Sequence, residues 1–324
     1  MEELIDQHPN SVSFMAGCAI ESDYVYVAAF PDAYDPRETI FSRLLVFDGE
    51  SDAKWFSHDI NANVVAVCVK SAGAAGRTLC ALSKEGEVEI YSNRDGARTI
   101  EKIPEAGLRL GSRGYTRDIR EIGKSLFVCG VNDQVYRRDE SDGSWTLITS
   151  APLKLVHALD PYFSMLESID GSSEQDVYTC GMNGRLYHFD GLQWHQISLP
   201  TDEHLQCVRC ISEEEVWICG KNGTLLVGNR SSGFKNVSTI DDNQSFWSLT
   251  KFQDKVYLAT TNAGMFVYDG IAIQAVDTGF DSGLWTYIVD STENVLWSFS
   301  PKEIAFFDGK TWTRVQHPDN EPVE

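Results

Sequence analysis

The chain has 324 residues, of which 42% are hydrophobic and 11% aromatic, an ordinary composition for a protein with a packed core. Its 27 basic and 48 acidic side chains give a formal net charge of −21, which argues against nucleic acid and anionic membrane surfaces as partners and permits a cationic one. The length allows two average domains or one large all-β domain.

The N-terminal residues and the cysteines predict a cytoplasmic protein. The first ten residues lack the basic and apolar regions of a signal peptide, and no apolar run is long enough for a membrane-spanning helix. The eight cysteines are scattered through a long chain, as expected for reduced thiols. Cys207 and Cys210 form a CxxC pair, but in a strand-like segment that sends residues three apart to opposite faces. We therefore expect no metal site there.

A short turn with an aromatic residue, an aspartate and a glycine recurs along the chain. It reads VFDG at 46–49, FDG at 189–191, VYDG at 267–270 and FFDG at 306–309, with weaker copies between. The equivalent positions are Phe47, Tyr91, Arg138, Phe189, Gly228, Tyr268 and Phe307. Seven units in this length average about 46 residues, close to the period of propeller blades.

Each unit reads as four short strands separated by turn residues. In the last unit the strands are LWTYIVD, NVLWSFS, EIAFFDG and TWTRVQ, with DSTE, PK and DGK between them. We predict an all-β fold, a seven-bladed β-propeller with four antiparallel strands per blade, A at the channel and D at the rim. The domain is expected to span residues 11–318, with tails at 1–10 and 319–324. No strand is left over for a latch, so we expect the ends to abut, with Glu2–Gln7 and Asn320–Glu324 frayed.

Repeated cysteines and tryptophans are interpreted as structural. The cysteines precede a glycine in equivalent strands, and the tryptophans begin outer strands, so both predict packing between blades. The cysteines are Cys129, Cys180 and Cys219, and the tryptophans are Trp145, Trp194 and Trp312.

The repeat pattern is D-V-[WY]-x-x-G-x-x-G-x-L-x-x-[FY]-D-G-x-x-W, best preserved at 175–194. It resembles bacterial propellers of the broad sialidase-like and photosystem-assembly-factor-like group. The S-x-D-x-G-x-x-W Asp box of sialidases is absent, since SDGSW at 141–145 has the wrong spacing. The resemblance therefore implies a fold and no particular activity.

The sequence contains no nucleotide-binding, serine-hydrolase or zinc-protease motif. The seven histidines are dispersed, and Glu213–Glu215 falls in a turn between strands, so no catalytic residue, metal ligand or cofactor is predicted. An alternative is a glycan- or small-ligand-binding propeller, or a hydrolase, that uses the channel mouth. Its ligand site would include Trp247 and Trp285, and its carboxylates would be Asp118, Glu121 and Asp160.

Three long insertions interrupt the repeats, and all are expected on one face of the ring. They are FPDAYDPRETIFS at 30–42, PEAGLRLGSRGYTR at 104–117 and APLKLVHALDPYF at 151–163. Long loops usually persist because they bind something, and tyrosine and arginine are typical anchors of protein interfaces. The candidate partner-binding residues are Tyr34, Asp35, Glu38, Arg109, Arg113, Tyr115, Arg117, Lys154, His157, Tyr162 and Phe163.

These features favour a non-enzymatic protein-binding propeller. Its most specific form is a bacterial cytosolic inhibitor or immunity protein that neutralises a cationic toxin or enzyme through the face with the long loops. The alternatives are the channel-mouth glycan-binding protein or hydrolase and an assembly or scaffolding factor, which would use the same face as an inhibitor.

Overall fold

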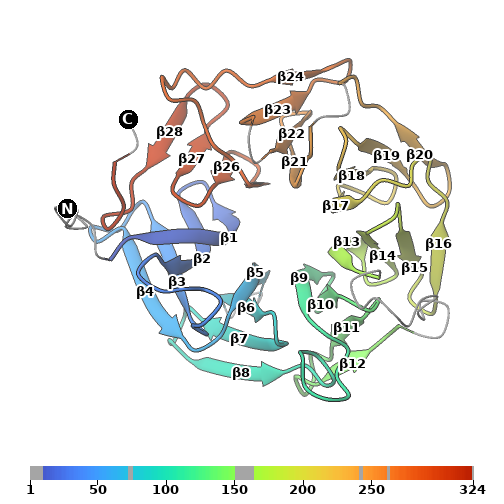
Figure 1. Ribbon diagram of the computed structural model, residues 1–324, viewed down its shortest axis with the longest axis horizontal. Helices are drawn as coiled ribbons and strands as arrows, with labels where there is room; N and C mark the ends of the chain where they lie inside the picture. Colours follow the sequence, from blue (N-terminus) through green and yellow to red (C-terminus); the bar gives the residue numbers. More distant parts are fainter. Residues whose placement is uncertain (1–9, 72–75, 150–163, 241–243, 261–262, 323–324) are drawn as a thin grey trace.

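The chain folds into a ring of seven β-sheets around a central channel (Figure 1). The computed structural model describes residues 10–71, 76–149, 164–240, 244–260 and 263–322, which contain 28 strands and no helix. Each sheet is a blade of four strands that follow one another in the chain and pair antiparallel, from A at the channel to D at the rim. The predicted seven-bladed propeller with four antiparallel strands per blade is confirmed.

The strands follow one another blade by blade along the chain. Blades 1 to 3 comprise β1 (Val12–Glu21), β2 (Tyr24–Pro31), β3 (Ser42–Asp48) and β4 (Trp55–Ile60); β5 (Val64–Ser71), β6 (Arg77–Ser83), β7 (Glu87–Ser92) and β8 (Arg98–Lys102); β9 (Thr116–Ile122), β10 (Ser125–Gly130), β11 (Val135–Arg138) and β12 (Trp145–Leu147). Blades 4 and 5 comprise β13 (Leu166–Ser173), β14 (Asp176–Gly181), β15 (Leu186–Phe189) and β16 (Trp194–Ile197); β17 (Leu205–Cys210), β18 (Val216–Gly220), β19 (Leu225–Asn229) and β20 (Gly233–Asn236). Blades 6 and 7 comprise β21 (Ser248–Phe252), β22 (Lys255–Ala259), β23 (Met265–Tyr268) and β24 (Ile273–Ala275); β25 (Ile288–Ser291), β26 (Leu296–Phe299), β27 (Ile304–Phe307) and β28 (Trp312–Val315).

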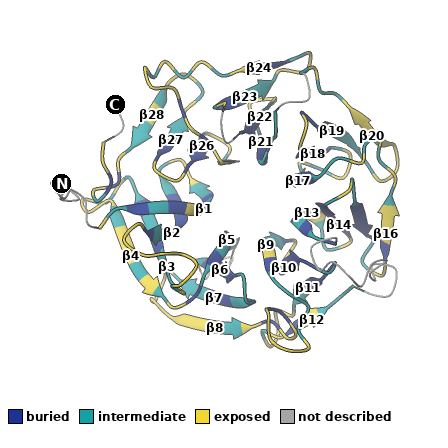
Figure 2. Ribbon diagram, viewed as in Figure 1, coloured by how far each residue is buried: buried dark blue, intermediate teal, exposed yellow. Residues whose placement is uncertain are grey.

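The hydrophobic core is divided into clusters that lie mainly between neighbouring blades. Trp297 and Phe299 of blade 7, for example, pack with Val12 and Phe47 of blade 1. Burial is greatest in the inner and middle strands, and the exposed strand residues gather on outer strands such as β8 and β20 (Figure 2). A single blade would leave these faces in water, so the ring is expected to fold as one cooperative unit.

The two ends of the chain meet where blade 7 adjoins blade 1. Oδ1 of Asn320 accepts hydrogen bonds from Ser11 Oγ (3.1 Å) and from the backbone N–H of Val12 (2.9 Å). Trp55 of blade 1 donates its indole N–H to the carbonyl of Gln316 (3.0 Å). Both blades are complete, so no strand is shared, as predicted. The expected fraying is wrong at Asn320, which is 3% exposed because its side chain ties the C-terminal segment to β1. Glu2–Gln7 lie outside the described residues.

The repeated Cys–Gly pair marks a place where two strands of one blade come unusually close. The pairing of β13 with β14 shifts by one residue beside Cys180 and Gly181. A Cβ atom added to Gly181 would overlap the carbonyl oxygen of Met165, and Gly130 and Gly220 are in the same situation. The glycine therefore serves a close backbone approach, while the fully buried cysteine before it belongs to the core.

The recurring FDG turns connect strands C and D, and their aspartates hold the turns closed. Oδ1 of Asp190 accepts hydrogen bonds from the backbone N–H groups of Leu192 (2.9 Å) and Gln193 (2.8 Å). Asp269 and Asp308 cap their turns in the same way. These backbone bonds, together with a neighbouring histidine, lower the pKa of Asp190 below its usual range. Part of the excess of acidic over basic residues therefore consists of aspartates that cap turns.

Each of three tryptophans on outer strands links its own blade to the preceding one. Trp194 donates its indole N–H to the carbonyl of Ile148 (3.2 Å), and Trp145 donates to a carboxylate oxygen of Glu101 (2.8 Å). Trp55 makes a similar bond at the closure of the ring, and Trp312 packs against the cluster between blades 6 and 7. The geometry of Trp145, Trp194 and Trp312 supports the prediction that they pack neighbouring blades together.

The first prediction concerns the close strand approach. Gly181→Ala should lower the free energy of unfolding by about 3 kcal/mol, because the new methyl group has no space and the backbone must move. Urea denaturation measures the loss. Gly49→Ala is the control, since the nearest atom to its added Cβ lies 3.1 Å away in the side chain of Asp23. Equal losses in the two variants would contradict this explanation of the Cys–Gly repeat.

Candidate functional site

The D-to-A connections between blades and the B-to-C loops within blades lie together on one face, which we call the loop face. The A-to-B and C-to-D turns form the opposite, turn face. This follows from four antiparallel strands in each blade, since consecutive strands end at alternate faces. The first two long insertions, at 30–42 and 104–117, are thus segments of the loop face, as predicted.

The first insertion, between β2 and β3, forms an exposed loop with an aromatic base. The ring of Tyr34 stands edge-on to Phe30 and Phe41, with centroids 6.5 and 5.6 Å away, yet remains 48% exposed. Asp35 caps the loop by accepting a 2.8 Å hydrogen bond from the backbone N–H two residues later. Asp35 and Glu38 are exposed. These three predicted residues are brought together on the surface.

The second insertion, between β8 and β9, is narrowed by a bridge between Gly107 and Gly114. At its tip Leu108 is 61% exposed and Leu110 is fully exposed. Sequence reasoning missed these two leucines because only the arginines and the tyrosine around them were weighed. The sequence did contain an indication of their exposure, because leucines in a Gly-rich loop have no core beside them to cover them.

The three arginines predicted to cluster in this insertion go to different places. Arg113 pairs with Glu105 at 2.9 Å on the surface, whereas Arg117 enters the channel mouth. Arg109 is exposed at the tip, and Tyr115 is half-buried below it. The basic patch inferred from the sequence is therefore divided, because Arg113 pairs with a carboxylate of its own insertion and Arg117 with Glu167 of blade 4.

The third insertion was predicted to supply Lys154, His157, Tyr162 and Phe163. These four residues, and the candidate carboxylate Asp160, lie outside the described residues.

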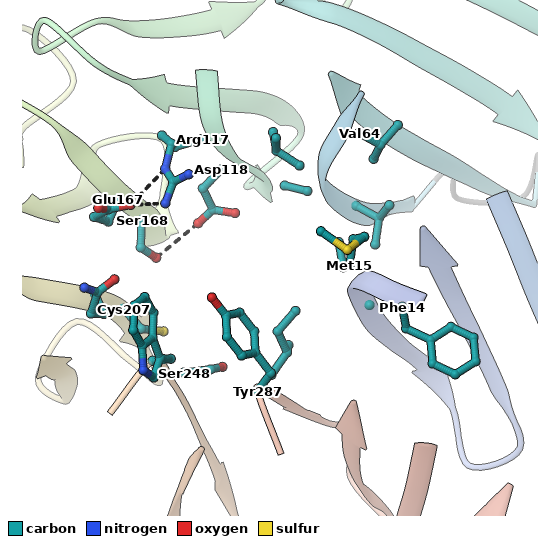
Figure 3. Close-up of a pocket in the computed structure, with 18 of the residues that line it drawn as sticks. Phe14, Met15, Val64, Arg117, Asp118, Glu167, Ser168, Cys207, Ser248 and Tyr287 are labelled. Atoms are coloured by element: carbon teal, nitrogen blue, oxygen red, sulfur yellow. Dashed lines mark hydrogen bonds and ion pairs between the residues drawn. The ribbon is translucent and has the colours of Figure 1, made fainter. Parts of the chain in front are cut away.

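A cavity of about 490 Å³ opens where the inner strands begin, at the loop-face end of the channel (Figure 3). Its two sides differ in chemistry. Met15 and Val64 line it from blades 1 and 2, whereas Arg117, Glu167 and Ser168 line it from blades 3 and 4. The cavity is thus apolar on one side and polar on the other.

Aromatic side chains form part of the mouth of this cavity. Trp247 lines the cavity with its ring stacked on Tyr287, with centroids 5.5 Å apart and an interplanar angle of 22°. Trp285, which was predicted to share the site with Trp247, does not line the cavity and is 65% exposed. Tyr287, two residues further on, lines the cavity in its place, and sequence reasoning had not assigned it to the site.

An ion-paired glutamate joins three blades across the cavity mouth. Glu167 at the beginning of β13 accepts hydrogen bonds from Arg117 (2.9 and 2.6 Å) and lies 3.0 Å from Nε2 of His204. Its side chain is only 5% exposed. Burial alone would raise the pKa of Glu167, but the bond to His204 and the charge of Arg117 lower it below its usual value.

Deeper in the channel, aspartates on strand A connect consecutive blades. Each accepts a hydrogen bond from a backbone N–H of the next strand A: Asp118 from Ile169 (3.1 Å), Asp170 from Cys210 (2.8 Å) and Asp290 from Ala19 (3.0 Å). Burial raises the pKa of Asp170. Burial alone would lower the pKa of Arg120, but these carboxylates raise it above its usual value, so a charged guanidinium sits among them.

The two described carboxylates that were considered for a hydrolase, Asp118 and Glu121, hold neighbouring blades together. Asp118 bonds to blade 4, and Glu121, further along β9, accepts a 2.9 Å hydrogen bond from the backbone N–H of Ser71 in blade 2. The two point to different neighbours and do not converge as an acid–base pair.

Exposed large apolar side chains are unevenly distributed over the part of the chain that the structure describes. On the loop face they are Met15, Tyr34, Ile40, Leu108, Leu110, Trp285 and Tyr287. The turn face has Leu192, Ile211 and Ile271, and the outer strands have Phe56 and Ile100. The members on the loop face follow one another over blades 7, 1 and 2.

Two kinds of feature are absent from the described residues. No helix there is long and apolar enough to cross a membrane. No three potential metal ligands come together in the same residues.

The chain is similar over nearly its whole length to the "Immune protein Tsi7" of Pseudomonas aeruginosa. The two are 28% identical over 316 residues, which cover 94% of this chain and 97% of the relative. No family model matches the chain, so the likeness to the sialidase-like and photosystem-assembly-factor-like group stays a prediction from the repeat pattern.

Solved propellers have the same architecture at low sequence identity. The WD40 β-propeller domain of Doa1 superposes with a TM-score of 0.66 at 10% identity, covering 92% of this chain and 95% of that one. The computationally designed Ika8 protein gives 0.63 at 14% identity, with 96% and 88% covered. Sqt1 of Saccharomyces cerevisiae gives 0.63 at 14% identity, with 96% and 86% covered. These likenesses show the fold alone.

The second prediction tests the glutamate bridge. The pKa of Glu167 is lower in the folded state than in the unfolded state. Its charge therefore stabilises the fold at pH values above the pKa of the unfolded state, and this stabilisation is lost as the pH falls through the pKa of the folded state. Glu167→Gln should therefore cost about 2 kcal/mol of unfolding free energy at pH 7 and much less in acid, as urea denaturation at both pH values would show.

Glu105→Gln is the matched control, because the pair of Glu105 with Arg113 is exposed. It should change the unfolding free energy by less than about 0.5 kcal/mol. A cost for Glu167→Gln that is the same at neutral and acid pH would rule out the charge of this residue as the cause.

Proposed function

We propose that this chain is a non-enzymatic immunity protein, a β-propeller that binds a protein toxin and neutralises it. The observation that carries the proposal is the end-to-end similarity to the immune protein of P. aeruginosa, which spans 94% of this chain and 97% of the relative. A match of this extent is far longer than a single repeat of about 46 residues.

The loop face is the surface that we propose for the toxin. It combines the long insertions with most of the exposed large apolar side chains among the described residues, such as Tyr34, Ile40 and Leu110. Exposed apolar side chains cost free energy in water and are typical of interaction sites. The turn face, in contrast, consists mainly of short hairpins that are closed by their own aspartates.

We further propose that the toxin presents a basic surface. The chain carries a net charge of −21, and exposed carboxylates on the loop face include Asp35, Glu38, Asp277 and Asp281. Opposite charges speed the encounter of two proteins and make its rate depend on salt. Because many turn-face aspartates serve their own turns, the loop-face carboxylates are the better indicator of the partner's charge.

The geometry favours binding over catalysis. Asp118 and Glu121, the described candidates for a hydrolase, hold neighbouring blades by hydrogen bonds to backbone N–H groups. We propose that the protein acts in the cytoplasm, where its eight free cysteines would stay reduced. An assembly factor would use the same loop face, and only the identity of the partner separates that alternative from an inhibitor.

The third prediction tests the function directly. A toxin encoded beside this gene should arrest the growth of a host when expressed alone, and co-expression of this chain should restore growth. The two purified proteins should form a stoichiometric complex on size exclusion. A complex without rescue of growth would favour the scaffolding alternative, and a neighbour that neither harms the host nor binds would contradict the proposal.

The fourth prediction locates the interface. Replacing both Leu108 and Leu110 by serine should weaken toxin binding at least about tenfold, because the variant removes apolar anchors from the loop face without disturbing the core. Calorimetry measures the affinity. The control replaces Leu192 and Ile271, which are 91% and 83% exposed on the turn face, by serine. A similar loss in both variants would refute the assignment of the face.

A further inference from the structure

The exposed apolar side chains of the loop face surround the channel mouth on one side. Trp285 and Tyr287 come from the connection between blades 6 and 7, and Met15 comes from the inner strand of blade 1. Met15 is 53% exposed although it lies on β1, the strand nearest the channel. A protein that exposes a methionine and two aromatic residues around one opening, at a cost in free energy, is suited to cover them with a partner.

The opening leads into the cavity of about 490 Å³, which has room for the side chains of a short protruding turn. Met15 and Val64 present an apolar wall, and Tyr287 stacks on Trp247 beside it (Figure 3). Methionine adapts its shape to what it contacts, and aromatic side chains in pockets are typical anchors of tight complexes. The cavity therefore lies next to the exposed apolar side chains Met15, Trp285 and Tyr287.

The polar wall of the cavity determines which polar groups of a partner can bind there. Both carboxylate oxygens of Glu167 and of Asp118 already accept hydrogen bonds or lie against His204. Within the described chain, by contrast, the buried Nε of Arg120 has no hydrogen-bond partner, and the guanidinium of Arg120 and the amide of Gln206 both line the cavity. The hydrogen-bonding groups available to a ligand on this wall are therefore mainly N–H donors, which bind carbonyl, amide or carboxylate oxygens.

We propose that the channel mouth is the central subsite for the toxin, and that it receives a protruding turn with an apolar side chain on one flank and acceptor oxygens at its tip. The apolar flank packs on Met15, Tyr287 and Trp285. The acceptor oxygens face Gln206 and Arg120. This inference rests on the proposed function and adds the part of the toxin that is recognised. It moves the centre of the interface from the long insertions to the mouth of the channel.

The test measures the affinity for the cognate toxin by calorimetry in three variants. Met15→Trp fills the cavity and removes no partner group, Trp285→Ser shortens the apolar lip, and Gln206→Leu removes an amide from the polar wall. The first two should weaken binding at least about tenfold and the third about threefold or more, with melting temperatures close to that of the wild type. The serine variants of Leu192 and Ile271 serve as matched controls and should bind like the wild type.

The outcomes separate this inference from the proposal on which it rests. If the wild-type chain binds the toxin and a folded Met15→Trp variant binds it equally well, insertion into the channel is overturned while the immunity function stands. If Met15→Trp does not fold, Trp285→Ser decides, since its side chain is 65% exposed and outside the core. If the wild-type chain binds no toxin, the proposed function fails and this inference fails with it.

Discussion

Packing between neighbouring blades is the interaction on which the rest of this structure depends. The core clusters join adjacent sheets, as Trp297 and Phe299 join Val12 and Phe47. Aspartates such as Asp118 on the inner strands and tryptophans such as Trp194 on the outer strands add bonds across the same boundaries. Since every blade needs two neighbours, the chain must close into a ring, and the tie from Asn320 to β1 completes it.

Because packing between blades fixes the strands, the two faces of the ring differ in how much their connections can vary. The C-to-D turns are short, and Asp190, Asp269 and Asp308 fix them with their own side chains. The loop face contains the connections that vary in length, and it also holds the opening of the channel. A ring held together by its inner and outer strands tolerates changes in these connections, so a binding surface is able to form there while the fold is preserved.

The fold was predictable from the sequence because it repeats, so that a weak pattern counted seven times becomes strong evidence. The site was only partly predictable, because its contacts come from residues distant in sequence. Arg117 was read as part of a surface patch, but it pairs with Glu167, fifty residues further on. Met15 drew no attention because an apolar residue in an inner strand reads as core, and only the closed ring shows that it faces an open cavity.

We propose that a toxin binds the loop face around the channel mouth. Hydrogen–deuterium exchange of the chain, alone and with its toxin, tests it most directly. Binding of the toxin should slow exchange in segments 13–16, 32–41, 106–115 and 283–287, with no change at the turns 190–193 and 269–272. Protection confined to those turns or to the outer strands β4 and β8 would contradict it.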